Sequence, residues 1–145
     1  MALAEPKPGL VISYAYLWRN QARRGEDHGR KMRPCVIILA VRPVSGGIRV
    51  VVAPVSHAPP PAPDHPSIEL PQATKRRLGL DEQRSWIVLD DLNQFQWPGP
   101  DLRPIGSGRA GVAYGFIPGS LLAAVRDRIA GLARTGRVSL TPRGE

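Results

Sequence analysis

Three polar side chains in the first half of the sequence are suited to chemistry on a phosphate. Arg33 precedes Pro34 at the start of an apolar run, and its permanently charged, planar guanidinium could grip a phosphate through paired N–H donors. Ser56 ends the next β-prone run, and its hydroxyl can both donate and accept hydrogen bonds. His28 lies in a charged stretch, where an imidazole could transfer protons near neutral pH. These residue types favour acid–base chemistry on a phosphate group.

Each of these residues also has an ordinary structural explanation. In a basic protein an arginine such as Arg33 can simply open a strand, and a serine at a strand end is a common turn residue. Histidines in loops often take no part in catalysis. This applies to His28 and to His57, which follows Ser56 and is a further candidate for proton transfer. The residue types alone leave both interpretations open.

The sequence contains no spacing typical of a metal or nucleotide site. Its three histidines are far apart and lack the i, i+4 pairing of a zinc-binding helix. It has no Gly-x-Ser-x-Gly elbow, phosphate loop or dinucleotide fingerprint. The single cysteine, Cys35, lies in an apolar run, where a thiol is most often a small buried hydrophobe. We therefore expect no metal and no cofactor.

The charge of the chain favours polyanionic partners. Its 145 residues include 20 Lys and Arg against 12 Asp and Glu, a formal net charge of +8. Such an excess attracts phosphate groups, so nucleic acid is the first candidate partner, and an acidic protein is another. The first residues lack a basic leader followed by an apolar stretch, and no run approaches the ~20 apolar residues of a membrane span. We expect a cytoplasmic protein without membrane contact.

Apolar patterning predicts a single domain over residues 1–145, mainly β with a C-terminal α-helix. Sixteen prolines and fifteen glycines indicate many turns and short strands, which points toward a small barrel. The connection with Pro43 and Gly46-Gly47 suits a hairpin. Short apolar or alternating runs typical of strands occur at 10–18, 33–41, 48–55, 67–70, 85–89 and 94–97.

Helices and irregular segments complete this prediction. An amphipathic helix is expected from Ser120 until a glycine at 136, and a short basic helical turn over 72–78 should stop at the next glycine. The charged segment 19–32 has no apolar periodicity, which predicts an exposed loop. The proline-rich insertion 58–66 cannot donate ladder hydrogen bonds. Residues 141–145 are expected to be frayed.

Two groups of side chains could bind RNA or could serve the fold. The basic residues at 75–77 could form either a solvated face or a track for RNA. Aromatic residues can stack unpaired bases, although their alternation along strands is more typical of a core, where we expect most of them. These aromatic residues are Tyr14, Tyr16, Trp18, Trp86, Phe95 and Trp97.

The order of these features resembles the toxins of the MazF/PemK family. Their chains run from Pro-Gly-x-Val through Arg-Pro, Pro-Ile/Val-Thr and an Asp-Gln-x-x-x-Ile/Leu-x-Trp-like stretch to a helix. The resemblance covers nearly the whole chain, and the order and spacing of short motifs give it its specificity. The counterparts here are Pro8-Gly9-Leu10-Val11, Arg33-Pro34, Pro54-Val55-Ser56, Asp90 to Trp97 and Ile117-Pro118 before the helix.

The resemblance implies a fold, an activity and partners. Family members have a small SH3-like β-barrel with a terminal helix, form homodimers, cut single-stranded RNA without a metal and are inhibited by an acidic antitoxin protein. The implied reaction is attack of a ribose 2′-hydroxyl on the adjacent phosphate. It needs a base, an acid for the leaving oxygen and a cation for the developing charge.

The resemblance also implies roles for individual residues. Arg33 matches the catalytic arginine of the family, and Ser56 stands where a catalytic threonine is usual. Asp90 matches an aspartate that some members use near the cut site, although the arginine that precedes it in some relatives is Val88 here. His28 lies where some members carry a loop histidine. The expected RNA-binding residues are Arg23, Arg24, Arg30, Lys31 and His57.

Two other functions compete with the nuclease. One is a protein on the same barrel that cuts nothing, such as the CcdB-like toxins that poison DNA gyrase. The other is a catalytically silent relative that binds RNA or a regulator, which the serine at Ser56 and the missing arginine at Val88 keep open. The pairing of Arg33 with Ser56 favours the nuclease.

Overall fold

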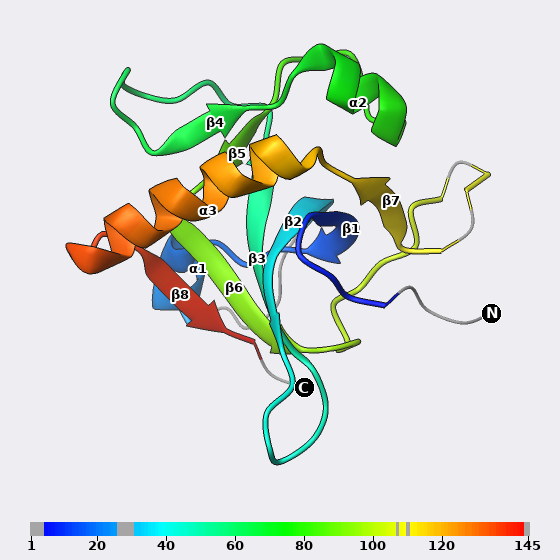
Figure 1. Ribbon diagram of the computed structural model, residues 1–145, viewed down its shortest axis with the longest axis vertical. Coiled ribbons are helices and arrows are strands. Elements are labelled where there is room, and N and C mark those ends of the chain that lie inside the picture. The colour runs from blue at the N-terminus through cyan, green and yellow to red at the C-terminus, as the bar shows by residue number, and fades with distance from the viewer. Residues whose placement is uncertain (1–4, 26–30, 107, 110, 144–145) are drawn as a thin grey trace.

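The computed structural model describes residues 5–25, 31–106, 108–109 and 111–143. Within them the chain forms one sheet system with three helices, and α3 crosses the front of the sheet in Figure 1. The predicted fold class, mainly β with a C-terminal helix, is confirmed. The elements are β1 (Leu10–Ala15), α1 (Arg19–Arg23), β2 (Met32–Val41), β3 (Arg49–Ser56), β4 (Ser67–Glu69), α2 (Gln72–Leu78), β5 (Trp86–Val88), β6 (Asp91–Gln96), β7 (Ala113–Phe116), α3 (Gly119–Arg134) and β8 (Ser139–Pro142).

Strand β3 is the branch point of the sheet. Its first half pairs with β6, whereas Val55 and Ser56 at its end pair with Ile87 and Trp86 of β5. Antiparallel ladders join β7, β1, β2 and β3, and β8 pairs with β6 in parallel. Hydrogen bonds do not close these described strands into a complete barrel, so the barrel is only partly formed.

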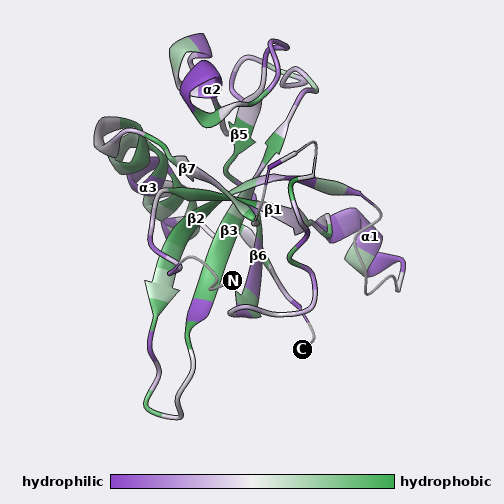
Figure 2. Cartoon of the chain, turned by 90° about the vertical axis from the view of Figure 1, so that its right-hand side faces the viewer, coloured by the Kyte–Doolittle hydropathy of each residue, from purple (hydrophilic) through white to green (hydrophobic). Residues whose placement is uncertain are grey.

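The central strands are buried on both faces because their apolar runs are continuous. On β2, Val36 and Ile38 pack into one cluster, with residues of α2 and α3, whereas Cys35 and Ile37 pack into a second cluster. The second cluster contains the stacked rings of Tyr14 and Phe95, whose centroids are 4.6 Å apart. Figure 2 shows hydrophobic colouring along β2 and β3 and mainly hydrophilic colouring along α1.

The expectation of a loop throughout 19–32 is wrong at its beginning, where α1 forms. The side chain of Gln21 accepts a hydrogen bond of 3.0 Å from the backbone N–H of Trp18, which satisfies a free donor at the helix start. No residue of α1 is buried. Local capping therefore accompanies this short helix, and apolar periodicity could not reveal it. Residues 26–30 of the expected loop lie outside the described residues.

The expectation of a frayed segment over residues 141–145 is wrong for residues 141–143, and residues 144 and 145 lie outside the described residues. Strand β8 continues to Pro142, and Arg143 is buried. The guanidinium of Arg143 lies 3.0 Å from the carboxylate of Asp101 and donates hydrogen bonds to the Ala15 carbonyl and the Asn93 side chain. The buried ion pair between Arg143 and Asp101 thus holds in place a segment whose sequence predicts no regular structure.

The expected helical turn before Gly79 is confirmed as α2, and Gly79 has the left-handed conformation that ends it, with φ of +72°.

The insertion 58–66 contains no helix or strand. Among the described helices, none is long and apolar enough to cross a membrane.

Candidate functional site

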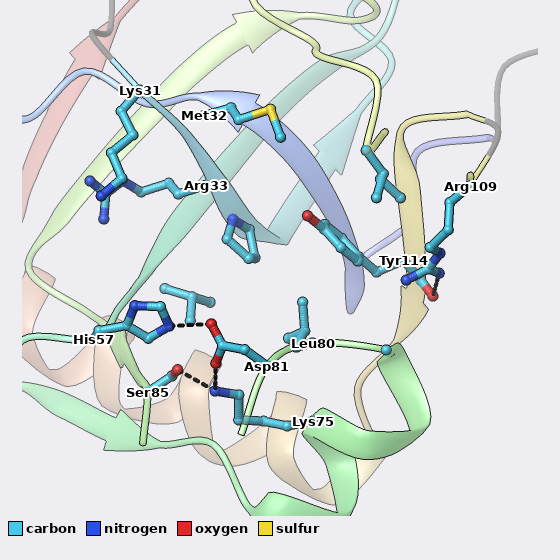
Figure 3. A pocket seen from close by; sticks show the side chains of 14 residues that line it. Lys31, Met32, Arg33, His57, Lys75, Leu80, Asp81, Ser85, Arg109 and Tyr114 are labelled. Carbon is cyan, nitrogen blue, oxygen red and sulfur yellow. Dashed lines mark hydrogen bonds and ion pairs between the residues drawn. The ribbon is translucent and has the colours of Figure 1, made fainter. Parts of the chain in front are cut away.

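Two neighbouring hollows lie at the ends of β2 and β3. The first, here named the basic cavity, has a volume of about 320 Å³, and the second, the tryptophan hollow, about 220 Å³. The consecutive residues Ser56 and His57 separate them, since Ser56 lines the hollow and His57 the cavity. Polar residues lining the basic cavity are Lys31, Arg33, His57, Lys75, Asp81, Ser85, Arg109 and Tyr114 (Figure 3). The tryptophan hollow is lined by Trp18, Arg19, Ser56, His65, Trp86, Asp90 and neighbouring residues.

Arg33 lies at the boundary between the two hollows. It lines the basic cavity, and its guanidinium carbon is 5.1 Å from the ring centroid of Trp18, which lines the tryptophan hollow. Its Nε is buried without a hydrogen-bond partner, and no carboxylate of the described residues lies within ion-pair distance. Arg33 is therefore a half-buried cation whose charge no acidic side chain of the described residues neutralises.

Ser56 is close to Arg33 in the strand register. The β2–β3 ladder pairs Cys35 with Pro54, so Arg33 and Ser56, each two residues beyond that pair, lie at the same end of the two strands. The Ser56 Oγ accepts a hydrogen bond of 3.1 Å from the Ala58 backbone N–H, as turn serines do. Its hydroxyl proton takes no part in that bond and can be donated to a ligand in the tryptophan hollow.

Asp90 lies in the same hollow as Ser56 and is half-buried between β5 and β6. Its carboxylate forms a 3.9 Å ion pair with Arg19. The neighbouring Asp91 is deeper and accepts a hydrogen bond of 2.8 Å from the Tyr16 hydroxyl. Burial raises the pKa of Asp91, against the opposing effect of its hydrogen bonds from Tyr16 and from the backbone of Arg19.

The other residues predicted to take part in catalysis or RNA binding do not all lie at these two hollows. His28 and Arg30 lie outside the described residues. Arg23, the last residue of α1, and Arg24, which follows it, are exposed and line neither the basic cavity nor the tryptophan hollow. Lys31 is exposed at the edge of the basic cavity, beside Arg33. The structure thus brings Arg33 and Lys31 together with His57, and Ser56 together with Asp90.

A chain of hydrogen bonds in the basic cavity was not predicted from the sequence. His57 Nε2 lies 2.8 Å from Asp81 Oδ2, and Asp81 Oδ1 lies 2.7 Å from Lys75 Nζ. The Lys75 ammonium also donates to Ser85 Oγ at 2.6 Å and to the Gln83 carbonyl. Figure 3 shows these side chains converging from the end of β3, from α2 and from the segment before β5.

Burial of Lys75 answers, for this residue alone, the question that the basic run 75–77 left open. The Lys75 side chain is 1% exposed, whereas Arg76 and Arg77 are exposed. Helical spacing contained a signal for this, because Lys75 is three residues before the buried Leu78 and so shares its face. Lys75 is neither a solvated charge nor a track for RNA.

The carboxylate of Asp81 is held in its charged form. Partial burial acts to raise its pKa, but the hydrogen bond and charge of Lys75, with smaller contributions from His57 and the backbone N–H of Gln83, hold the pKa of Asp81 below its usual range. A charged Asp81 accepts a hydrogen bond from an N–H at Nε2 of His57. Nδ1 then carries the free lone pair.

Arg109 and Tyr114 form the far side of the cavity. Arg109 donates a hydrogen bond of 2.9 Å to the Leu78 carbonyl at the end of α2, and its guanidinium lies 5.2 Å from the Tyr114 ring centroid. The Tyr114 hydroxyl points into the cavity in Figure 3. With Lys31, Arg33 and Lys75, the cavity has four permanent cations against the single carboxylate of Asp81, which favours an anionic ligand.

No group of three or more His, Cys, Asp or Glu side chains suited to hold a metal ion occurs among the described residues. Comparison of the chain with protein-family models and with curated proteins finds no match.

Proposed function

We propose that the protein is an endoribonuclease that cuts single-stranded RNA without a metal, as the toxin of a type II toxin–antitoxin system. The observation that carries this proposal is the position of Arg33. Its charge has no acidic partner among the described residues, it lines a cavity rich in cations, and it lies on the ring of Trp18. A guanidinium placed in this way suits a phosphate flanked by an unpaired base.

The two hollows fit the two parts of a nucleotide. The basic cavity suits the phosphate, since Lys31 and Arg33 line it. The tryptophan hollow suits a base, which could stack on the indole rings of Trp18 or Trp86. Bases must be unpaired to reach such rings, so single strands are the favoured substrates.

The reaction proposed is transfer of the phosphate within the RNA. The ribose 2′-hydroxyl attacks the adjacent phosphorus, the bond to the 5′ oxygen breaks, and a 2′,3′-cyclic phosphate forms. Arg33 stabilises the charge that develops on the phosphate oxygens. Ser56, at the border between the two hollows, donates a hydrogen bond from its hydroxyl to one of these oxygens, and Asp90 lies in the tryptophan hollow with Ser56, where it can take or give a proton.

Incubation of the purified protein with mixed RNA in excess chelator tests this function. We expect cleavage to persist in chelator and to leave cyclic phosphate at the 3′ ends and hydroxyl groups at the 5′ ends, which end-mapping detects. Strict dependence on a divalent ion would contradict the mechanism.

One observation favours a second function, a silent protein that binds RNA. The Ser56 oxygen already accepts a hydrogen bond from the Ala58 backbone, which an ordinary turn would explain. The same basic cavity and indole rings would then hold RNA without cutting it. Tight, salt-sensitive binding of single-stranded RNA with no change in RNA length over hours would favour this function.

The proposed toxin acts in the cytoplasm and has two protein partners. One is a second copy of the chain, in a homodimer that binds RNA across its two-fold axis. The other is an acidic antitoxin, which the net charge of +8 and the cations of the basic cavity would attract. Light scattering at micromolar concentration tests the homodimer, and an active monomer would contradict it.

A further inference from the structure

The chain of hydrogen bonds through His57, Asp81 and Lys75 has the arrangement of an oriented general base. His57 follows β3 at the rim of the basic cavity, and its side chain is 51% exposed. Its Nε2 is bonded to Asp81, and Nδ1 points away from Asp81 in Figure 3 without a hydrogen bond to any described residue. An imidazole with one nitrogen fixed by a carboxylate and the other free can accept a proton.

Lys75 holds this pair in position. An ammonium has three N–H donors, and Lys75 uses all three, on Asp81 Oδ1, Ser85 Oγ and the Gln83 carbonyl. Because its donors are saturated and its side chain is 1% exposed, Lys75 cannot contact RNA. The Gln83 backbone N–H donates a further hydrogen bond of 3.2 Å to Asp81 Oδ1. The carboxylate that orients His57 is thus itself oriented by buried and backbone donors.

We propose that His57 is the general base that removes the proton of the ribose 2′-hydroxyl, with Asp81 orienting it and Lys75 as a positioning residue. This inference rests on the proposed nuclease function and assigns the proton transfer to the cavity that contains Arg33. His57 Nδ1 takes the 2′-hydroxyl proton, the 2′ oxygen bonds to phosphorus, and the 5′ oxygen leaves and takes a proton from water. Asp81 stabilises the imidazolium, which then returns its proton to water.

The sequence resemblance does not supply this assignment, since it matches no family motif at Asp81 or Lys75. Of the two histidines that the sequence offers for proton transfer, His28 and His57, the assignment selects His57. His57 and Arg33 line one cavity, so one phosphate group and its 2′-hydroxyl could lie within reach of both. The base and the cation that the reaction requires would then act on the same nucleotide.

Cleavage of mixed RNA in chelator by four proteins tests the proposal: the natural chain, Arg33→Ala, His57→Ala and Asp81→Asn. We expect His57→Ala to lower kcat by about 10²- to 10⁴-fold, the usual contribution of a general base. Added imidazole should restore part of this activity, because a free base can enter the vacated space. A purely structural role of His57 would show no such rescue.

The positioning residues have a different signature. Asp81→Asn and Lys75→Met should lower kcat by up to about 10²-fold through misplacement of His57, with KM for RNA nearly unchanged. Asp127→Asn on α3 and Lys7→Met are matched controls at exposed positions, and both should keep full activity. His57→Ala alters a half-exposed side chain, so it remains informative if Lys75→Met does not fold.

Two outcomes separate this inference from the function on which it rests. If Arg33→Ala abolishes cutting while His57→Ala cuts like the natural chain, the His57 assignment is overturned and the nuclease stands. If the natural chain itself leaves RNA intact, both the proposed nuclease function and the assignment of His57 are contradicted. Loss of activity in His57→Ala with recovery in imidazole supports both.

Discussion

The guanidinium of Arg33 lies over the indole ring of Trp18, with 5.1 Å between its central carbon and the ring centroid. Trp18 follows β1, and Arg33 is the second residue of β2, so the antiparallel β1–β2 ladder sets their separation. Contact with an aromatic face limits the rotamers of the arginine without neutralising its charge. A rigid cation between a basic cavity and an aromatic hollow is the arrangement on which nucleotide binding would depend.

The first prediction concerns the geometry of that cation. Arg33→Ala should abolish chelator-resistant cutting of RNA, and Arg33→Lys should restore little, because lysine keeps the charge but lacks paired planar donors. Cleavage rates measured on gels test both variants, and Arg126→Ala on α3 is an exposed control that should keep full activity. Unaltered cutting in both Arg33 variants would remove this residue from the site.

The second prediction concerns base stacking on Trp18. Trp18→Ala should weaken binding of single-stranded RNA by about 1–3 kcal/mol, the usual contribution of one stacked base. Fluorescence anisotropy with an RNA that carries deoxyribose at the mapped cut position measures this affinity without cleavage. Trp97→Phe is the matched control, because Trp97 packs near Phe95 and lines neither hollow. Equal affinities of the Trp18 and Trp97 variants would contradict stacking in the tryptophan hollow.

The strands and the long helix could be predicted from the sequence because they depend on local patterns. The β2–β3 hairpin shows this, since two apolar runs separated by a proline and two glycines have few other ways to pair. Strands β7 and β8 could not be found in this way. β7 contains Gly115 with φ of +133°, and β8 pairs in parallel with a strand distant in sequence.

The site was only partly predictable for a related physical reason. Arg33 and Ser56 could be recognised from their neighbours in the sequence, and the strand register brings them to the same end of the sheet. The contact between His57 and Asp81 joins residues 24 positions apart, with β4 and α2 between them, and only the fold brings them together. From sequence alone, a lysine such as Lys75 is expected on the surface. Only the structure shows that it is buried with three hydrogen-bond acceptors.

The third prediction concerns the stability that Arg143 gives to the C-terminal segment. Arg143→Met should lower the free energy of unfolding by up to about 3–5 kcal/mol, because it removes the closer cation beside the buried carboxylate of Asp101 and leaves only Arg103, 4.0 Å away. Urea unfolding measures this, with Arg137→Met as an exposed control. The double variant with Asp101→Leu should recover much of the loss, since neither charge remains. An unchanged unfolding midpoint in Arg143→Met would show that the ion pair contributes nothing.

The fourth prediction concerns the pH dependence of stability at Asp91. Burial raises its pKa above the ordinary 3.8, so the folded chain holds this proton more tightly than the unfolded chain does. The resulting contribution to stability is full below pH 3.8 and is lost as the pH rises through the raised pKa. Asp91→Asn does not titrate. The unfolding free energy of this variant, relative to the natural chain, should therefore improve between about pH 4 and pH 7. A difference that is constant over this range would contradict it.

The last prediction concerns the proposed acidic antitoxin. A basic cavity that takes phosphate oxygens should also take Asp and Glu side chains, so such a partner and RNA should compete for it. A disordered inhibitor loses chain entropy on binding, and a long contact surface is needed to offset that loss. Expression of the chain alone should arrest growth, and co-expression of the adjacent gene should relieve the arrest. Pull-down of the pair should weaken as salt rises, because the attraction between the charged surfaces is screened. Arrest that no neighbouring gene product relieves, or no arrest at all, would instead favour the silent RNA-binding function.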